Sequence, residues 1–203
     1  MALLTINPIN PEARKIQQVT DSLKRDGVII IPTDTVYSLA CSIHNRKAIE
    51  RICKIKNVKV EKSLFTFICR DLSQAAIYAK QIDNSIFKLM KKSFPGPFTF
   101  ILEASHEVPK VLQYKRKTIG LRIPDHEILL DLIDKMDSPL IVTSLPEKEL
   151  EVEYSTDPTL MYDEYGNQVD FVIDGGIGDI EETTVLDCTG DELEIVRQGI
   201  GEI

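Results

Sequence analysis

The sequence predicts one α/β (α+β) domain in which helices cover a single mixed β-sheet. Three observations support this fold class. Helix-like and strand-like segments alternate between residues 12 and 144, and three more strand-like segments follow near the C-terminus. The 203 residues are 43% hydrophobic, which is enough for a packed core. No Gly/Ser linker interrupts them, so we expect residues 1–203 to form one domain.

Five segments have the periodicity or the boundaries of helices. Residues 12–26 end at Gly27, and residues 45–56 begin at a candidate cap, Asn45. The second of these helices is expected to bury Ala48, Ile49, Ile52 and Cys53. The other three cover 73–80, capped by Asp71 or Ser73, then 84–94 and 127–136. The polar region 147–168 is interpreted as a loop with one helix at 157–165.

Short apolar runs predict the strands. They cover 28–32, 64–69, 98–104, 118–124, 139–144, 169–176, 183–189 and 193–199. Several of these runs contain no alternation of polar and apolar residues, which is typical of strands buried on both faces. The sequence therefore predicts a sheet that is covered by helices.

The charge is divided unevenly along the chain. Residues 147–203 hold 17 acidic and two basic residues, which leaves 15 acidic and 22 basic residues in positions 1–146. The two parts therefore carry net charges of −15 and +7. A basic first part is compatible with a phosphate-bearing ligand, although solvated lysines give the same composition.

Signatures of several other protein classes are missing. The sequence contains no GxxxxGK[ST] phosphate loop and no GxSxG elbow, and GGIG at 175–178 lacks the spacing of a dinucleotide fingerprint. His44, His106 and His126 lack paired ligand spacing, so we assign them to the surface and expect no metal site. The four cysteines form no CxxC pair and are interpreted as buried reduced thiols. Without a signal peptide or an apolar run of ~20 residues, we expect a bacterial-type cytoplasmic protein with no membrane partner.

A repeated pattern marks the candidate site, because apolar strands end in hydroxyl groups or an arginine. The residues concerned are Thr33, Thr35, Thr118, Arg122, Thr143, Ser144, Thr183, Thr184 and Arg197. Ligands of open α/β sheets bind beside strand ends, so we predict that Thr35, Arg122, Ser144 and Arg197 line one pocket. A buried arginine needs an anionic partner. For Arg122 this partner is either a ligand carboxylate or phosphate, or an internal Asp or Glu in a structural salt bridge.

A second candidate element is the basic segment 44–62, which holds seven Lys/Arg and two Glu. Lys54 and Arg51 are expected to share a helix face, and Lys56 falls where the helix should end. The segment either neutralises a polyphosphate or forms a solvated face.

Eight segments, in this order, resemble the YrdC/YciO superfamily, whose best-known members are threonylcarbamoyl-AMP synthases. They are PTDTVYSLAC, KIK, FPGPFTFIL, TIGLRIPDH, PLIVTSLP, VDFVIDGG, TTVLDCT and EIVRQGIG. The similarity covers about residues 12–201 and is clearest from Gly27 onward. CKIK, MKKSFPG, EVPKVL and KRKTIGLRIP are more similar to the YciO-like branch.

The resemblance implies a YrdC-like fold, with a twisted mixed sheet, helices outside and a concave basic cavity. It also implies a nucleotidyltransferase reaction in which L-threonine, bicarbonate and ATP give threonylcarbamoyl-AMP and pyrophosphate. The product serves t6A37 modification of tRNA. The implied partners are ATP, L-threonine and bicarbonate, and Mg²⁺ would arrive with the ATP.

The same resemblance assigns roles to residues of this chain. The threonine-binding set is Thr33, Thr35, Arg122, Thr143 and Thr183, in which Arg122 would hold the threonine carboxylate. The ATP-binding set is Lys54, Lys56, Thr118, Ser144 and Arg197, in which the two lysines would contact the phosphates. Neither the resemblance nor the residues identify a general base, so no catalytic residue is assigned.

Three positions depart from the family pattern. Ser38 replaces a glycine, and Lys56 replaces an arginine and therefore lacks its bidentate fork. Pro146 replaces the asparagine of an SxN motif, which in this chain reads Ser144-Leu145-Pro146, and proline has neither an amide side chain nor a backbone N–H.

Two functional classes remain open at this point. One is a synthase-type enzyme, weakened by the departures. The other is a non-catalytic or altered-substrate protein of the same superfamily that binds a nucleotide, double-stranded RNA or tRNA. A single deep cavity around Lys54, Lys56, Lys115, Arg116, Lys117 and Arg122 would favour a small substrate, whereas a broad basic surface would favour RNA.

Overall fold

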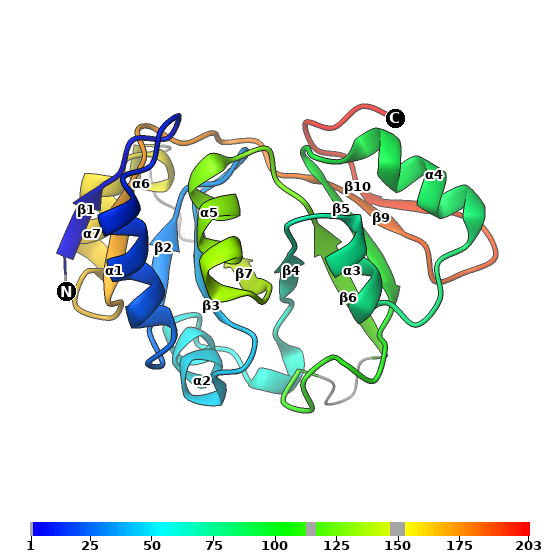
Figure 1. Ribbon diagram of the computed structural model, residues 1–203, viewed down its shortest axis with the longest axis horizontal. Helices are drawn as coiled ribbons and strands as arrows, with labels where there is room; N and C mark the ends of the chain where they lie inside the picture. The colour runs from blue at the N-terminus through cyan, green and yellow to red at the C-terminus, as the bar shows by residue number, and fades with distance from the viewer. Residues whose placement is uncertain (1, 113–116, 147–152) are drawn as a thin grey trace.

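The computed structural model describes residues 2–112, 117–146 and 153–203. Within these ranges, ten strands form one sheet in the order β1-β8-β2-β3-β7-β4-β6-β5-β9-β10 (Figure 1). The strands are β1 (Ala2–Thr5), β2 (Ile29–Ile31), β3 (Ser38–Ser42), β4 (Thr66–Ile68), β5 (Phe98–Glu103), β6 (Thr118–Arg122), β7 (Leu140–Ser144), β8 (Phe171–Asp174), β9 (Thr184–Asp187) and β10 (Glu194–Arg197). Four of the neighbouring pairs are parallel and five are antiparallel, so the predicted mixed sheet is confirmed.

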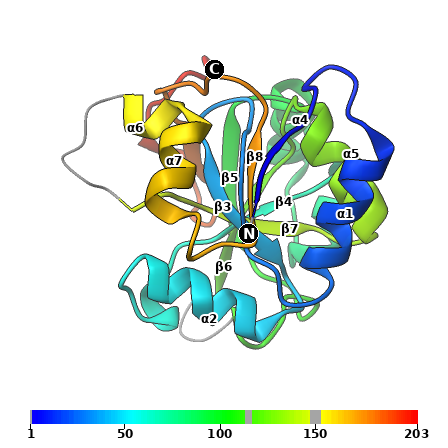
Figure 2. The same cartoon turned by 90° about the vertical axis from the view of Figure 1, so that its left-hand side faces the viewer.

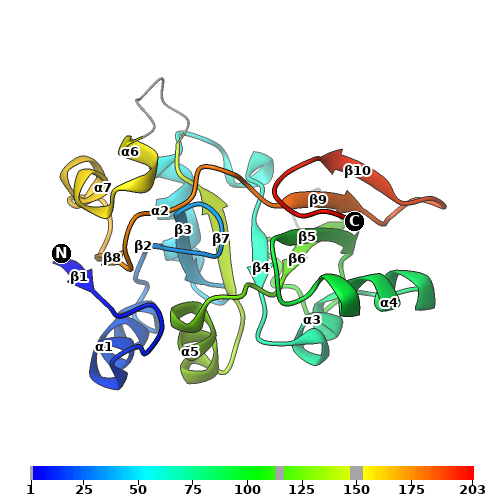
Figure 3. The same cartoon turned by 90° about the horizontal axis from the view of Figure 1, so that it is seen from above.

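Helices cover both faces of the sheet. They are α1 (Ala13–Leu23), α2 (Arg46–Ile55), η1 (Val60–Lys62), α3 (Leu72–Tyr78), α4 (Asn84–Ser93), α5 (Glu127–Met136), α6 (Glu153–Thr156) and α7 (Pro158–Tyr165). Figure 3 shows α1, α5, α3 and α4 on one side of the sheet and α2, α6 and α7 on the other, and Figure 2 shows the same separation from the β1 end. In the described part of the chain, no helix combines the length and the apolar character needed to cross a bilayer.

The central strand β2 is buried on both faces. Ile29 and Ile31 belong to an apolar cluster with residues of α1 and α5, and Ile30 belongs to a second cluster with residues of α2. Successive side chains of a strand point to opposite faces, so an unbroken apolar run is what two covered faces require.

The strands β5 and β6 have one apolar and one polar face. Phe100 of β5 and Leu121 of β6 are fully buried in the same cluster as Met90 of α4. The alternate residues Thr99 and Arg122 point to the opposite side, where the sheet lines a pocket. This polar face positions the candidate site.

Most of the predicted elements are confirmed, with boundaries shifted by a few residues. Helix α5 agrees at both ends, and the helix expected at 157–165 is α7. Of the two candidate caps for α3, Asp71 is the one used, since its Oδ1 accepts a hydrogen bond from the Gln74 N–H at 2.8 Å. Asn45 precedes α2 as predicted, but its side chain donates to the Leu23 carbonyl rather than capping the helix.

Four elements are absent from the predictions: β1, β3, η1 and α6. Strand β3 is entirely buried and pairs with both β2 and β7, although it begins and ends with serine. Of the predicted buried thiols, Cys41, Cys53 and Cys69 are confirmed, whereas Cys188 is half-buried.

Candidate functional site

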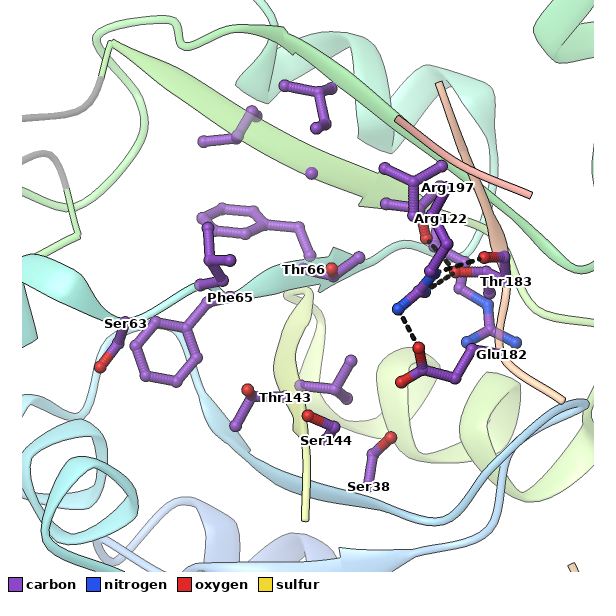
Figure 4. A pocket seen from close by; sticks show the side chains of 18 of the residues that line it. Ser38, Ser63, Phe65, Thr66, Arg122, Thr143, Ser144, Glu182, Thr183 and Arg197 are labelled. Atoms are coloured by element: carbon purple, nitrogen blue, oxygen red, sulfur yellow. Dashed lines mark hydrogen bonds and ion pairs between the residues drawn. The ribbon is translucent and has the colours of Figure 1, made fainter. Parts of the chain in front are cut away.

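The polar face of the sheet forms a cavity of about 290 Å³. Strands β3 to β7 (in chain order), β9, β10 and the loops beside them contribute its wall, so segments from Thr35 to Arg197 meet there. Figure 4 shows polar side chains directed into the cavity from several of these strands. The polar lining consists of Thr35, Ser38, Ser63, Thr66, Thr99, Thr118, Arg122, Thr143, Ser144, Glu182, Thr183 and Arg197.

Strand β6 forms part of the cavity floor. Thr118, Gly120 and Arg122 line it at alternate positions, as the two-residue repeat of a strand requires. A Cβ atom at Gly120 would lie 3.1 Å from Thr66 Oγ1 and 3.3 Å from Thr99 Cγ2. Glycine therefore leaves the space between the two threonines open, whereas any side chain at this position would crowd the cavity.

Arg122 is anchored by an ion pair inside the protein. Its Nη2 donates to Asp34 Oδ1 at 2.5 Å and to Thr35 Oγ1 at 3.0 Å, and the two charged side chains are only 5% and 11% exposed. Burial lowers the pKa of Arg122 and the Asp34 charge raises it, yet an arginine stays protonated at physiological pH. Its buried Nε has no hydrogen-bond partner among the described residues.

The sequence left two possible partners for Arg122, a ligand anion or an internal carboxylate. The structure contains the internal salt bridge. The buried Nε is a donor that the described residues leave unsatisfied. The guanidinium is thus held in place by one carboxylate while it still lines the cavity.

A small hydroxyl network holds the Thr33–Thr35 turn against Arg122. Thr33 Oγ1 lies 3.0 Å from Thr35 Oγ1, accepts the Thr35 N–H, and donates to the Val36 carbonyl. Thr35 lines the cavity as predicted, but Thr33 does not. Thr33 instead lines a neighbouring depression, which it shares with Thr35, so the structure does not place it in the lining of the first cavity.

Arg197 of β10, which is near enough to Arg122 for its charge to lower the pKa of Arg122, is bound to the start of β9. Its Nε donates to the Thr183 carbonyl at 3.0 Å and its Nη2 to Thr183 Oγ1 at 3.1 Å. Thr183 Oγ1 also lies 3.0 Å from Thr99 Oγ1 of β5. The remaining terminal nitrogen of Arg197, Nη1, forms an ion pair with Glu182, as the dashed lines in Figure 4 show.

The two lysines of the basic segment behave differently. Lys56, directly after α2, donates to the Ser144 carbonyl at 2.6 Å and to Ser144 Oγ at 3.1 Å. It therefore reaches the cavity margin, although its side chain is not part of the lining. Lys54 is exposed in the last turn of α2 and lines neither cavity, so its placement at the site is wrong for this structure. Helix α2 ends at Ile55, and the next residue, Lys56, directs its side chain toward Ser144 of β7.

The second depression lies on the far side of the Asp34–Arg122 pair and is lined by Thr33, Asp34, His126 and the loop 175–180. His126 is half-buried, and its Nδ1 is buried without a partner among the described residues. Burial lowers the pKa of His126, which keeps the ring neutral at pH 7. The prediction of a surface position is therefore wrong for His126, whereas His44 and His106 are exposed as expected.

The predicted convergence is confirmed, because Thr35, Arg122, Ser144 and Arg197 all line the same cavity. Thr118, Thr143 and Thr183 join them there. Sequence reasoning missed Asp34 and Glu182, the carboxylates that pair with the two arginines. Asp34 stands within the quoted PTDT motif and could have been found as the nearest acid to a hydroxyl cluster, but no local signal identifies Glu182.

The charged lining residues in the described part of the chain are Arg122, Arg197 and Glu182, with a net charge of +1. Of the other basic residues considered, Lys117 is exposed and outside the lining, and Lys115 and Arg116 lie outside the described residues. A concave cavity in this part of the chain fits a small ligand better than a broad RNA surface.

The comparison with known families agrees with the fold. The sequence model of the family described as Telomere recombination, Sua5_yciO_yrdC, matches residues 21–199. The chain belongs to the Sua5/YciO/YrdC family. The resemblance inferred from the eight segments is thereby confirmed.

One relative, YciO of Escherichia coli, matches this chain over nearly its whole length. This chain is 42% identical over 199 residues to "Uncharacterized protein YciO" of Escherichia coli (strain K12). The alignment covers 98% of this chain and 95% of the relative. The crystal structure of E. coli YciO superposes with a TM-score of 0.90 and 41% identity, covering 99% and 97% of the two chains.

The synthases of the family are more distant. A Pyrococcus abyssi threonylcarbamoyl-AMP synthase is 29% identical over 206 residues, and the match covers 95% of this chain but only 59% of that protein. The structure of P. abyssi Sua5 complexed with L-threonine has a TM-score of 0.86 at 26% identity, with 98% of this chain and 58% of that one covered. The fold of this chain is thus found in both branches, and in P. abyssi Sua5 it accounts for 58% of the protein.

Proposed function

We propose that the protein is a threonylcarbamoyl-AMP synthase-like nucleotidyltransferase, which converts L-threonine, bicarbonate and ATP to threonylcarbamoyl-AMP and pyrophosphate. Membership of a family that includes such synthases supports the reaction class. The observation that carries the proposal is the grouping of Arg122, Arg197 and the Lys56–Ser144 pair at one cavity. These residues supply cationic groups around a space suited to one small substrate next to a nucleotide.

Arg122 is the group best suited to a carboxylate. Its guanidinium is fixed by Asp34 and Thr35, and its Nε still lacks an acceptor. A substrate carboxylate at this place would gain charge-assisted hydrogen bonds without ordering a long side chain, because Arg122 is already ordered. Thr35, Thr143 and Thr183 would then contact the rest of the threonine. Thr33 is left out of this set because it faces the neighbouring depression.

Arg197, Lys56 and Ser144 are the groups best suited to phosphates, with Thr118 on the nucleotide side. The threonine amine and bicarbonate would first give a carbamate with loss of water. A carbamate oxygen then attacks the α-phosphorus, and the bond to the pyrophosphate leaving group breaks. Negative charge increases on the phosphate oxygens during this step, and fixed cations stabilise it more in the transition state than in the ground state.

Magnesium belongs to the proposal only as the counter-ion of ATP. The described residues contain no group of three or more His, Cys, Asp or Glu that could hold a metal ion. Asp34 and Glu182, the acidic residues nearest the cavity, are both ion-paired with arginine. This donor set does not fit a resident metal, so the ion would be held by the phosphates themselves.

The direct test is the release of pyrophosphate from ATP by the purified protein in bicarbonate buffer with Mg²⁺. Release that depends on L-threonine is expected, and detection of threonylcarbamoyl-AMP by mass spectrometry would identify the product. Release that is equal with and without threonine would contradict the proposal.

Pro146 favours a second candidate function, that of a nucleotide-binding protein with no turnover. A proline at this position supplies no amide group to the cavity margin beside Ser144. This candidate predicts that ATP binds in calorimetry while no threonine-dependent pyrophosphate appears.

The replacement Lys56→Ala is expected to weaken ATP binding about tenfold, because it removes a charge-assisted hydrogen bond at the phosphates. Stability should fall by about 1 kcal/mol, since Lys56 also donates to Ser144. Calorimetric titration with ATP and thermal unfolding measure the two effects.

The replacement Lys54→Ala provides the matched control. It removes the same charge from the same helix end, but from a side chain that is exposed. ATP affinity and stability should therefore stay close to those of the parent protein. Equal losses of affinity in the two variants would show that Lys56 acts only through the overall electrostatic potential of the protein and not through a direct contact with the phosphates.

A further inference from the structure

The two arginines of the cavity are neutralised by carboxylates that differ in their access to solvent. Asp34 is 11% exposed and lies behind Arg122, outside the lining of the cavity. Glu182 is 39% exposed and is itself a lining residue beside Arg197. One carboxylate is therefore a fixed part of the wall, whereas the other shares the cavity with any ligand.

Arg197 does not need Glu182 to keep its position. Its Nε and Nη2 both donate to Thr183. The Thr183 hydroxyl is in turn within hydrogen-bond distance of the Thr99 hydroxyl. Only Nη1 is directed to Glu182. The guanidinium would thus stay in place if the Glu182 side chain moved away, and a half-exposed ion pair has little free energy to resist such a movement.

We propose that Glu182 is a specificity-determining residue that occupies Arg197 and discriminates against highly charged phosphate ligands. The inference rests on the proposed nucleotide site. An incoming phosphate must take the place of the Glu182 carboxylate at Arg197, and the displaced carboxylate remains near the phosphates. The electrostatic penalty rises with the number of negative charges on the ligand, so the site favours an adenylate over a nucleoside triphosphate.

The local charges agree with this role. Glu182 reduces the net charge of the described lining residues from +2 to +1, and Asp34, which lies outside the lining, balances the charge of Arg122. Figure 4 shows Glu182 and Arg197 on the same side of the cavity, so this negative charge lies on the path to the arginine. No other acidic residue is found among the described lining residues.

The test is the binding of AMP, ADP and ATP to the full chain and to the Glu182→Gln variant by calorimetry at low salt. Glutamine has almost the same shape, and its amide oxygen can still accept from Arg197, so the fold should persist, which thermal unfolding would verify. Affinity should rise with the charge of the ligand, by about tenfold for ATP and by about twofold for AMP. The gain should shrink at high salt.

The Glu181→Gln variant is the control, because it removes the same charge one residue away from an exposed side chain outside the cavity lining. It should change the affinity for each nucleotide less than about twofold. An equal gain in the two variants, or a loss of ATP affinity in Glu182→Gln, would overturn the inference.

Titrations with inorganic tripolyphosphate, with inorganic phosphate as the singly phosphorylated comparison, distinguish a failure of this inference from a failure of the proposed function. If no form of the protein binds ATP but Glu182→Gln binds tripolyphosphate more tightly than the parent, the nucleotidyltransferase proposal fails and the role of Glu182 stands. If Glu182→Gln binds tripolyphosphate no more tightly than the parent, the role of Glu182 is refuted, whatever the nucleotides do.

Discussion

The replacement Asp34→Ala is expected to lower the free energy of unfolding by about 3–5 kcal/mol, because it leaves a buried arginine without its carboxylate. The side chain of Arg122 is only 5% exposed, and the other acceptor that it contacts is the neutral hydroxyl of Thr35. Chemical denaturation measures the loss. In the proposed site, the loss of a positioned guanidinium should also weaken threonine binding.

A double-mutant cycle tests whether the ion pair is the cause. The variant Asp34→Ala/Arg122→Met removes both charges, so it should be more stable than Asp34→Ala alone. Asp125→Ala is a control, because the Asp125 contact with Asp34 is made by the backbone N–H and survives the change. A loss below about 1 kcal/mol in Asp34→Ala would mean that solvent reaches Arg122 and that the pair is not a structural anchor.

The replacement Pro146→Asn is expected to raise threonine-dependent pyrophosphate release. A restored hydrogen bond to a charged group contributes ~1.5–3 kcal/mol, and each 1.4 kcal/mol changes a rate tenfold, so the ceiling is roughly 10–100-fold. We expect a smaller gain, because the backbone after β7 is adapted to the fixed φ of proline. Initial rates at saturating ATP measure the effect.

The variant Pro146→Ala separates the amide group from the loss of proline. Alanine frees the backbone in the same way but supplies no side-chain amide, so it should leave the rate near that of the parent. An equal rise in both variants would assign the effect to the backbone. An unchanged rate in a folded Pro146→Asn protein that binds ATP would favour the nucleotide-binding role without turnover.

The sequence was sufficient to predict those parts of the fold that depend on local periodicity. Helix α5 was predicted at both ends because its apolar residues repeat at helical spacing between clear boundaries. Strand β3 was missed because its buried serines, Ser38 and Ser42, have the composition of a loop. Their burial depends on pairing with β2 and β7, which is a tertiary effect.

The candidate site was also predicted in part, where local sequence was sufficient, and missed where the tertiary structure decides. Strand ends with hydroxyls predicted the convergence of Thr35, Arg122, Ser144 and Arg197, because a sheet brings its strand ends together. The ion-pair partners could not be predicted, since Asp34 lies 88 residues from Arg122 and the pairing requires the complete sheet. The end of α2 was predicted close to Lys56, but the contact of Lys56 with Ser144, 88 residues away, depends on the tertiary structure.

The strand order has a consequence for synthesis of the protein on the ribosome. Strand β9 pairs with β5, and β10 adds to β9, so the part of the wall that carries Thr183 and Arg197 is translated after β5, β6 and β7. A nascent chain that has already emerged through β7 holds Arg122 and Ser144 but lacks this part of the wall. Contacts such as Thr99 with Thr183, 84 residues apart, form only after a long loop has closed. The cavity therefore has no complete ligand site until β9 and β10 have been translated, and a ligand that contacts both Ser144 and Arg197 would stabilise the docking of these two strands.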